Sequence, residues 1–385
     1  MALGHWLQLS LIEGIGPILT RRLIDATGSA QAACGASADQ LAAIEGIGLA
    51  RSRKIHASLR LAAALAEEEF NRCSRQGVKL ICPDDELYPV LLKSIPDPPS
   101  VLYVRGNLEP RDLNAAAIVG SRRCSFYGRE QAERFAALLA GAGVTVISGG
   151  ARGIDSASHR GAMSHPHGRT IAVLGSGVDI PYPPENRELF DQIAERGAIL
   201  SEYPLGEGPR KENFPRRNRI VSGMSRGVLI IEADERSGAL ITARQAGEDH
   251  GRPVFALPGR VDNPLSIGPH MLIRDGATLV TKLEDILEGL GPLPQEAMEP
   301  GLFDAIAASA PASDEATPPT PPPPDLAGLT ERQRAVLDAI GTDSANVDLL
   351  VDRTSLPAQV ILQELTFLSL KGQVRRVDGQ TYVRR

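Results

Sequence analysis

The sequence predicts an α/β protein: an open, mostly parallel sheet that follows a helical module and precedes a winged helix. In the middle of the chain, apolar runs of three to five residues alternate with amphipathic stretches long enough for helices. Such uninterrupted apolar runs are typical of strands covered on both faces, as in parallel sheets. Paired glycine turns come before this region, and a proline-rich stretch comes after it. These changes in pattern predict domains at 1–75, 76–290 and 326–385, with a linker at 291–325.

Residues 1–75 are predicted to form a helical module of the helix-hairpin-helix or SAM-like type. Gly14-Ile15-Gly16 and Gly46-Ile47-Gly48 each follow one apolar helical stretch and precede another. In such a turn, the free backbone N–H groups at the start of the second helix can hold a DNA phosphate. Basic residues follow both turns, at Arg21, Arg22, Arg51, Arg53 and Lys54. The alternative is two tight turns in a purely structural helical cap, and the sequence does not decide whether this module contacts DNA.

Residues 76–290 are predicted to form the α/β core. The apolar runs expected to be strands are Ala115–Val119, Val144–Ile147, Thr170–Leu174, Ala198–Leu200, Val228–Ile231, Val254–Ala256 and Ala277–Val280. A helix is expected between the first two runs, over about residues 128–140. Open parallel sheets bind their ligands at the carboxyl ends of the strands.

Small residues gather at those carboxyl ends. The first three runs end in Gly120-Ser121-Arg122, Ser148-Gly149-Gly150 and Gly175-Ser176-Gly177. Glycine lets an anion approach the backbone, and the N-terminus of the next helix adds the positive end of a dipole. This edge of the sheet is therefore predicted to bind phosphate.

Residues 210–226 form a basic cluster in a chain that is acidic overall. The segment carries six positive charges and one negative charge, whereas the formal net charge of the chain is -6. Phe214 lies inside this cluster and is one of only eight phenylalanines. Cations that follow phosphates, together with a ring that stacks on a base, are typical of a site for single-stranded nucleic acid. A solvated basic helix start with Phe214 in the core is the alternative, and this segment alone does not separate the two.

The phosphate ligand is not predicted to be a nucleotide cofactor. No stretch has the nucleoside-triphosphate pattern G-x-x-x-x-G-K-[ST]. The dinucleotide pattern G-x-G-x-x-G is also missing after the first strand, where Ser-Arg-Arg-Cys follows Gly120. The second strand ends in Ser148 and lacks the acidic residue that would hold an adenosine ribose. We therefore expect no cofactor.

Neither a metal site nor a membrane contact is predicted. The four cysteines contain no C-x-x-C pair, and Pro166 interrupts the spacing of His165 and His167. Widely spaced cysteines fit a reducing compartment. No apolar run reaches the ~18 residues of a membrane helix, and the first residues lack the basic and apolar segments of a secretory signal. A cytoplasmic protein is expected.

The C-terminal part is predicted to be a tethered winged helix. The linker at 291–325 contains the proline-rich run Pro318–Pro324 and should form an extended tether. The elements expected after it are helices at Thr330–Ile340, Val347–Asp352 and Pro357–Lys371, then a hairpin of Val374–Val377 and Thr381–Val383 around Asp378-Gly379. The third helix has one basic residue, Lys371, at its end. A protein contact or a weak DNA contact is therefore favoured over sequence-specific recognition.

The core resembles the DprA/Smf family of DNA-processing proteins over about residues 78–290. The segments that carry the resemblance are Tyr88–Tyr103, Val119–Arg122, Ser148–Asp155, Tyr182–Asn186, Ser201–Pro204, Lys211–Arg219, Arg236–Ala243 and Phe255–Gly259. The resemblance implies a Rossmann-like fold that binds single-stranded DNA, forms a homodimer and helps to load RecA during natural transformation. The family site uses an arginine after Gly-Ser and a lysine three residues before a phenylalanine. Both patterns are present, as Arg122 and as Lys211 with Phe214.

Together these arguments predict a DNA site of nine residues: Ser121, Arg122, Gly149, Gly150, Lys211, Phe214, Arg217, Asn218 and Arg219. Arg122 and the backbone near the two glycines would hold one phosphate, Lys211 would hold an adjoining phosphate, and Phe214 would stack on a base. Arg217 and Arg219 are expected either to add positive field or to hold the loop. Asn218 would hydrogen-bond a neighbouring loop or a base edge.

The alternative function is a nucleotide hydrolase, and no catalytic residue is predicted for it. The chain can be compared with the phosphoribohydrolases, a related family with the motif Pro-Gly-Gly-x-Gly-Thr-x-x-Glu, and the nearest stretch here is Arg236–Thr242. Ala239 stands where the motif has threonine, and Thr242 stands where it has the catalytic glutamate. Without that acid, glycosidic cleavage lacks an evident general acid or base. Asp155 is interpreted as a helix-start charge rather than as a catalytic group.

Overall fold

The computed structural model describes residues 2–292 and, further along, residues 330–340, 345–354, 356–357, 360–361, 364–365, 368, 374–376 and 381–384. The chain divides into two compact units, Met1–Ala307 and Ala308–Arg385. The predicted linker at 291–325 lies outside the described residues except for Gly291 and Pro292. The predicted domain limits stay predictions.

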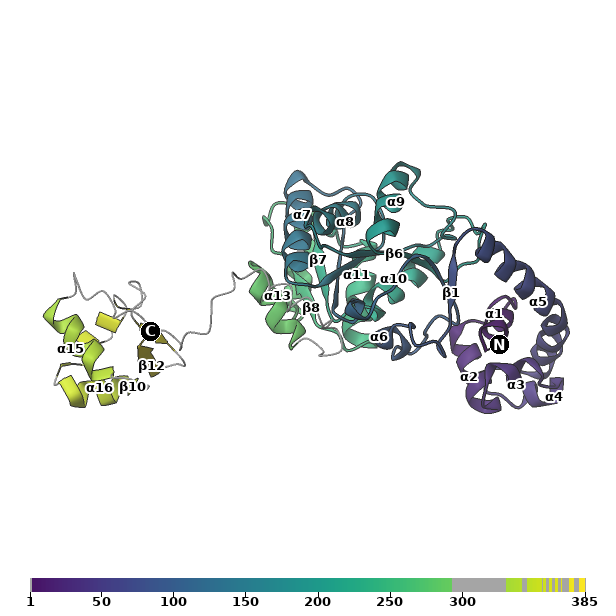
Figure 1. Cartoon of the computed structure of the whole chain (residues 1–385), viewed down its shortest axis with the longest axis horizontal. Helices are drawn as coiled ribbons and strands as arrows, with labels where there is room; N and C mark the ends of the chain where they lie inside the picture. Colours follow the sequence, from purple (N-terminus) through teal and green to yellow (C-terminus); the bar gives the residue numbers. More distant parts are fainter. Residues whose placement is uncertain are drawn as a thin grey trace, which may run out of the picture. The chain divides into compact units, whose positions relative to one another are not determined.

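The first unit begins with a helical module that contains both predicted glycine turns. Its helices are α1 (Ala2–Ser10), α2 (Pro17–Thr27), α3 (Ala30–Cys34), α4 (Ala38–Ala42) and α5 (Leu49–Arg75) (Figure 1). Gly14 and Gly46 have φ of 83° and 86°, a left-handed backbone conformation that glycine adopts without strain. Arg51 donates to the carbonyl oxygen of Gly14 at 2.5 Å, and Arg22 donates to that of Glu45 at 3.1 Å. Each turn is therefore held by an arginine that follows the other turn.

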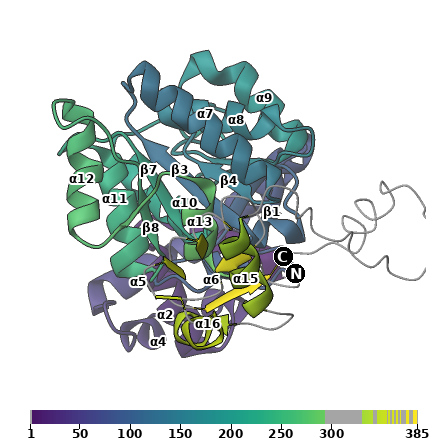
Figure 2. The same cartoon turned by 90° about the vertical axis from the view of Figure 1, so that its left-hand side faces the viewer.

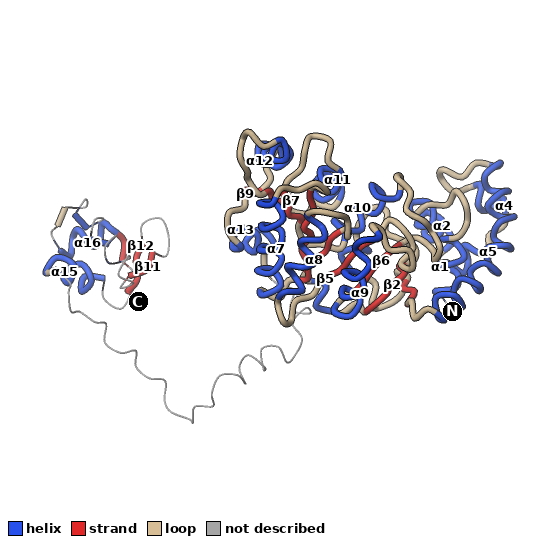
Figure 3. Tube along the Cα trace, turned by 90° about the horizontal axis from the view of Figure 1, so that it is seen from above, coloured by secondary structure: helices blue, strands red, loops and turns tan. Residues whose placement is uncertain are grey.

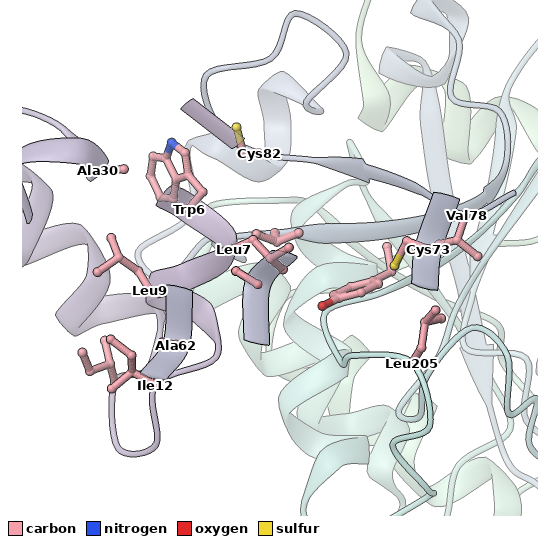
Figure 4. Close-up of a cluster of buried hydrophobic side chains, with 14 of the residues drawn as sticks. Trp6, Leu7, Leu9, Ile12, Ala30, Ala62, Cys73, Val78, Cys82 and Leu205 are labelled. Atoms are coloured by element: carbon pink, nitrogen blue, oxygen red, sulfur yellow. The ribbon is translucent and has the colours of Figure 1, made fainter. Parts of the chain in front are cut away.

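The helical module and the sheet share a hydrophobic core. Trp6 of α1, Cys73 near the end of α5 and Leu205 belong to one buried cluster (Figure 4). The indole N–H of Trp6 donates to Asp84 at 2.6 Å. The carboxylate of Glu69 on α5 accepts a hydrogen bond from the N–H of Leu205 at 2.7 Å. Removing the module would therefore expose apolar surface that belongs to the core of the whole unit.

The sheet of this unit has nine strands in the described part of the chain, in the order β1-β2-β6-β5-β4-β3-β7-β8-β9. Their bounds are β1 (Lys79–Ile81), β2 (Leu102–Gly106), β3 (Ala115–Gly120), β4 (Thr145–Ser148), β5 (Thr170–Val173), β6 (Ala198–Ser201), β7 (Val228–Ile231), β8 (Val254–Ala256) and β9 (Thr278–Leu279). All seven expected runs form strands, and they pair in parallel. The predicted α/β class with a mostly parallel sheet is confirmed.

Two strands were not among the expected runs. β1 pairs antiparallel with β2, and β2 pairs antiparallel with β6, so both extend one edge of the parallel sheet. β1 has only three residues and includes Lys79, which is exposed. A strand that is short and partly polar does not produce the uninterrupted apolar run on which the prediction depended.

Helices lie on both sides of the sheet (Figure 2, Figure 3). Their bounds are α6 (Val90–Lys93), α7 (Phe126–Gly141), α8 (Ile154–Ser164), α9 (Arg187–Arg196), α10 (Asn213–Gly223), α11 (Gly238–Arg244), α12 (Ile267–Arg274) and α13 (Leu283–Leu290). On β3, Ala117 and Val119 pack in one core with α6, α10 and α11, whereas Ala116 and Ile118 pack in another with α7, α8 and α13. This alternation follows from the two-residue period of a strand.

The strand order reverses at β3. From β3 the chain continues through β4, β5 and β6 towards one edge, whereas β7, β8 and β9 lead to the other edge. β3 and β7 are neighbours, with Val119 aligned to Ile230. In open α/β sheets, such a reversal leaves a crevice at the carboxyl ends of the strands where ligands bind.

The second unit has the predicted winged-helix arrangement. Its described elements are α15 (Glu331–Ile340), β10 (Ala345–Asn346), α16 (Val347–Thr354), β11 (Val374–Arg376) and β12 (Thr381–Arg384), and the strands pair in the order β10-β12-β11. Thr330 and Gln333 exchange two hydrogen bonds of 3.2 Å at the start of α15, which is a capping box. The described part of the predicted helix at Pro357–Lys371 contributes Leu365 and Leu368 to the buried core. Much of that helix lies outside the described residues.

A buried ion pair fastens the start of β3 to the sheet. Asp112, in the short helical turn η1 (Pro110–Leu113), accepts two hydrogen bonds from Arg169 at 2.5 and 2.7 Å. It also accepts one from Thr145 at 3.0 Å. Both charged groups are buried, so each depends on the other to offset the loss of hydration.

Replacing Asp112 by alanine is expected to lower the free energy of unfolding by about 3 kcal/mol, because it leaves the Arg169 charge buried with fewer partners. Urea unfolding followed by Trp6 fluorescence measures this, since Trp6 is the chain's only tryptophan and is buried in the first unit. Asp191→Ala serves as the control because Asp191 pairs with Arg105 at the surface, and such a pair contributes about 0–1 kcal/mol. Equal losses in the two variants would contradict the expectation.

Candidate nucleic-acid interface

A cleft of about 790 Å³ lies at the carboxyl ends of β3 and β7, at the reversal of strand order. Its walls come from the loops after β3, β4 and β7 and from the start of α10. Six of the nine predicted site residues line it: Ser121, Arg122, Lys211, Phe214, Arg217 and Asn218. Segments almost a hundred residues apart in the sequence therefore meet where the sequence pattern predicted.

Arg217 is buried in the wall of this cleft. Its Nε makes no hydrogen bond in the part of the chain that the structure describes. Burial lowers the pKa of Arg217 to about 10, although the nearby carboxylate of Asp155 opposes that shift. The group therefore stays charged at neutral pH while part of its hydrogen-bonding capacity is unused. Because the guanidinium lines the cleft, its charge would attract an anion that enters there.

The two predicted glycines have different roles. Gly149 lines a small pocket together with Arg122, Arg217 and Phe214. A Cβ at Gly149 would stand 1.7 Å from Nη1 of Arg217, so the guanidinium occupies the space next to this backbone. The side-chain direction at Gly149 is therefore filled by Arg217, and contact of the Gly149 backbone with a phosphate stays a prediction.

Gly150 does not line the cleft or the small pocket. Its φ is 69°, and a Cβ there would stand 2.6 Å from the ring of Phe190. The residue is glycine because the backbone turns through the left-handed region against a packed ring. The packing of Phe190 accounts for a glycine here, and contact of Gly150 with phosphate stays a prediction.

Phe214 forms part of the cleft wall and belongs to none of the hydrophobic clusters of this unit. The guanidinium carbon of Arg122 lies 5.0 Å from the centre of its ring, which is a cation–π contact. The ring of Tyr182 lies 5.8 Å away, tilted by 49°. Gly175 lies behind the ring, where a Cβ would stand 3.1 Å from it. The alternative in which Phe214 is a core residue therefore does not hold.

Lys211, Arg122 and Arg123 are the exposed cations of the cleft. Lys211 lies two residues before α10 and forms no ion pair with another described residue. Arg210, its neighbour, is paired with Glu207 at 2.9 Å. Of these two adjacent cations, Lys211 is the one whose charge is left for a ligand.

Ser121 and Asn218 shape the loops of the cleft. The Ser121 hydroxyl accepts a hydrogen bond from the N–H of Arg123 at 3.1 Å. The Asn218 side-chain amide donates to the carbonyl of Gly238 at 3.2 Å. Of the two partners considered for Asn218, the structure therefore shows the neighbouring loop.

Arg219 is buried away from the cleft. Its guanidinium forms ion pairs with Asp97 at 2.9 Å and with Glu202 at 2.6 Å. These pairs fasten α10 to two distant loops. The geometry thus supports the second role considered for Arg219, holding the loop, and not direct contact with DNA.

Glu232 was missed as a site residue, although it organises the loop that carries Arg122. Its φ is 48°, the single positive value among non-glycine residues in the described ranges. Its side chain accepts hydrogen bonds from the N–H and hydroxyl of Ser125 at 2.7 and 2.5 Å, and from Asn263 at 3.3 Å. Its carbonyl accepts from the N–H of Ser121 at 2.7 Å. The signal in the sequence is an acidic residue directly after the buried strand Val228–Ile231.

Asp155 occupies the first turn of α8, as the helix-start interpretation requires. One of its carboxylate oxygens accepts a hydrogen bond from the N–H of Ala151 at 3.2 Å. Burial raises the pKa of Asp155, although Arg217 and that hydrogen bond act in the opposite direction. Its position beside Arg217 gives it a role in the local charge balance.

Two family sequence models match the chain. The model described as DNA recombination-mediator protein A matches residues 79–291, which is more than half of the chain. The model of the DprA winged helix domain matches residues 318–380. The chain belongs to the DprA/Smf family.

Relatives from several bacteria agree with this assignment. The chain is 35% identical to Protein Smf of Synechocystis, over 99% of this chain and 98% of that protein. It is 42% identical to Protein Smf of Escherichia coli, over 79% of this chain and 77% of that protein. The X-ray structure of DNA processing protein A from Streptococcus pneumoniae is similar, with a TM-score of 0.65 and 34% identity over 75% of this chain and 98% of that one.

Family membership does not favour the alternative nucleotide hydrolase. Thr242, at the position expected to carry a catalytic glutamate, is buried on α11.

Among the described residues, no group of three or more histidine, cysteine, aspartate or glutamate side chains is placed to hold a metal ion. In the same part of the chain, no helix combines the length and the apolar character needed to cross a membrane.

A buried histidine beneath the cleft makes the stability of this unit sensitive to acid. His159 on α8 shares a hydrogen bond of 2.7 Å with the Thr170 hydroxyl, and its other ring nitrogen has no partner among the described residues. Burial lowers the pKa of His159 from 6.5 to about 3. The unfolded chain therefore binds a proton at a pH where the folded chain does not. The contribution of the neutral ring is complete above about pH 6.5 and is lost as the pH falls towards about 3.

Below pH 6.5, the free energy of unfolding of the unaltered chain should fall as the pH is lowered. Replacing His159 by asparagine should reduce that slope by up to about 1.4 kcal/mol per pH unit. Urea unfolding at a series of pH values, followed by Trp6 fluorescence, measures the slope. The same substitution at His167, which is exposed, controls for the change of side chain. An unchanged slope in the His159 variant would show that the folded ring titrates normally.

Proposed function

We propose that this chain binds single-stranded DNA in the cleft, largely without regard to base sequence. The observation that carries the proposal is the buried guanidinium of Arg217, whose Nε lacks a partner among the described residues, beside the exposed cations Arg122 and Lys211. Single strands are bound by cations that follow phosphates and by rings that stack on bases. Phe214 is such a ring in the same cleft. The name of the matching family, DNA recombination-mediator protein A, and that of the relative DNA processing protein DprA agree with DNA as the ligand.

Binding would couple the phosphate and base contacts. In the free protein, the guanidinium of Arg122 lies over the ring of Phe214. A phosphate between Arg122 and Arg217 would draw Arg122 from the ring, because a charge-assisted hydrogen bond is stronger than an exposed cation–π contact. The ring face thus becomes available for a base. The side-chain amide of Asn218 is already bonded to Gly238, which leaves little to select one base over another.

The proposal extends to assembly and to the cellular role. One cleft holds only a few nucleotides, and contacts to exposed phosphates are screened at physiological salt. Two clefts on a homodimer would hold one longer strand, because the second binding step occurs at a high effective concentration. Family resemblance supports a homodimer through the core, loading of RecA during natural transformation, and a cytoplasmic location. No catalytic activity is proposed.

The flanking parts are given supporting roles. We assign the winged helix at 326–385 a protein contact or a weak DNA contact, and the linker at 291–325 the role of a tether. In the helical module, Arg22 and Arg51 hold the two glycine turns, so these cations are partly engaged within the chain.

Arg122→Ala and Lys211→Ala should each weaken binding to oligo-dT. Each should also flatten the plot of log K against log salt by roughly 0.7 for every phosphate that the variant no longer neutralises. Phe214→Ala should cost about 1–3 kcal/mol of binding free energy and leave that slope unchanged, because a stacked ring releases no counterions. Fluorescence anisotropy titrations at several salt concentrations separate the two effects.

Matched controls come from the same unit. Arg244→Ala removes an exposed cation that is paired with Glu248 and does not line the cleft. Phe126→Ala removes a ring that is 81% exposed and also lies outside the cleft lining. Both should bind like the unaltered chain. If Phe214→Ala unfolds, or if the controls lose as much affinity as the cleft variants, the proposed site is wrong.

A chain that ends at Gly291 should keep most of its affinity for single strands and remain a dimer. The helical module is retained because it shares a core with the sheet. Affinity for oligo-dT should rise sharply once the length suffices to span two clefts. Sedimentation and binding titrations test this. A loss of more than about tenfold, or ~1.4 kcal/mol, would transfer the main DNA contact to the winged helix, and a monomer with smoothly rising affinity would exclude the dimer.

A further inference from the structure

Helix α5 has an apolar outer face as well as a buried inner face. Its inner face carries seven buried residues that pack against the module and the sheet: Ser52, Ile55, Leu59, Ala62, Ala66, Glu69 and Cys73. On the outside, Leu61 is 72% exposed and Leu65 is 52% exposed. Ala57 is exposed on the same side. Figure 1 shows α5 at the outer edge of the first unit. Isolated exposed leucines are ordinary, but an apolar stripe on a long helix indicates a contact surface.

Charges lie symmetrically about the centre of this stripe. Lys54 lies seven residues before Leu61, and Glu68 lies seven residues after it. Residues seven apart share one face of an α-helix, with a drift of only about 20° per heptad. Both charged residues are exposed, and neither forms an ion pair with another residue of the described chain. Followed from the N-terminal to the C-terminal end of α5, the outer face therefore has a positive charge, then apolar side chains, then a negative charge.

We propose that this face pairs with the same face of a second copy of the chain, with the two α5 helices antiparallel about a twofold axis at Leu61. In that register Leu61 meets its own copy, and Leu65 packs on the partner's Ala57. Lys54 lies opposite the partner's Glu68, and Glu68 lies opposite the partner's Lys54. A twofold contact requires a self-complementary surface, and this stripe is one. A parallel pairing would instead bring like charges together.

The contact is weak by itself. Two helices that meet through a few side chains bury less area than the ~1,000 Å² of a stable interface. Its ion pairs lie at the rim, where salt screens them. The pairing becomes effective when copies are already held close together. It requires neither the cleft nor DNA, so it is independent of the function proposed above.

Charge reversal tests this pairing on the full chain by sedimentation velocity at low ionic strength. The unaltered chain should form concentration-dependent larger species, the first of them with twice the mass of the species present at high dilution. Lys54→Glu and Glu68→Lys should each raise the dissociation constant of this step by about tenfold or more, since each places like charges opposite one another twice. An equimolar mixture of the two variants should recover the association. In the mixed pair, opposite charges face each other at both ends.

Matched controls are the adjacent reversals Arg53→Glu and Glu67→Lys. They make the same changes in net charge on the same helix, off the axis of the stripe, and should associate like the unaltered chain. Circular dichroism should show the fold intact in all variants, because the altered side chains are exposed.

Recovery on mixing separates this pairing from other occupants of the face. A different protein or a nucleic acid on the stripe would respond to the single variants but not to their mixture. The inference is overturned if the unaltered chain shows no such step, if the single variants associate normally, or if the mixture does not recover. If the core homodimer of the proposed function fails to form, the step appears as monomer to dimer and is still weakened by Lys54→Glu.

Discussion

Arg217 imposes the constraint around which the cleft is organised. A guanidinium that is buried with an unused donor is costly, and the surrounding residues are arranged to hold it there. Gly149 leaves the space that the guanidinium fills, and Asp155 partly balances its charge. Arg219, two residues along α10, is anchored by Asp97 and Glu202, so the helix cannot carry Arg217 away from the cleft. The protein therefore holds a desolvated cation in place before any anion arrives, which reduces the reorganisation that binding requires.

The loop after β3, which forms another wall of the cleft, is held by the carboxylate of Glu232, a residue that does not line the cleft. Glu232, in a left-handed conformation at the end of β7, gathers hydrogen bonds from Ser121, Ser125 and Asn263. Gly128 must lack a side chain because a Cβ would stand 2.3 Å from the Glu232 carboxylate. This carboxylate orders the loop in which Arg122 lies. Arg122 itself stays exposed, and its guanidinium lies over the ring of Phe214, so one cation of the cleft is buried and another is exposed.

Much of the fold, and the edge of the sheet at which the cleft lies, could be predicted because they follow from local patterns. Apolar runs locate the parallel strands, and small residues after them locate the carboxyl edge. The partners of each cation could not be predicted in this way. Arg219 and Arg217 are two residues apart in one basic cluster, yet one is neutralised by Asp97, 122 residues away, and the other keeps an Nε without a partner in the described chain. The sequence shows how many cations the cluster contains. Only the packing of distant segments shows which of these cations are already paired and which are left for a ligand.

The two contacts proposed between copies have a consequence that neither has alone. A core homodimer and an α5 pairing are both twofold contacts, but they use different surfaces of the chain. Each would close a dimer by itself, whereas two distinct twofold axes on one chain generate an open series of copies. On a short strand this series has nothing to stabilise it, because the α5 contact is small. On a long strand, dimers bound side by side are held at high effective concentration, so each weak contact adds to the retention of its neighbours. If both proposed contacts form, cooperative coverage of long single strands would follow from a stripe of a few side chains, and it would weaken with salt through both the phosphate contacts and the rim charges of α5.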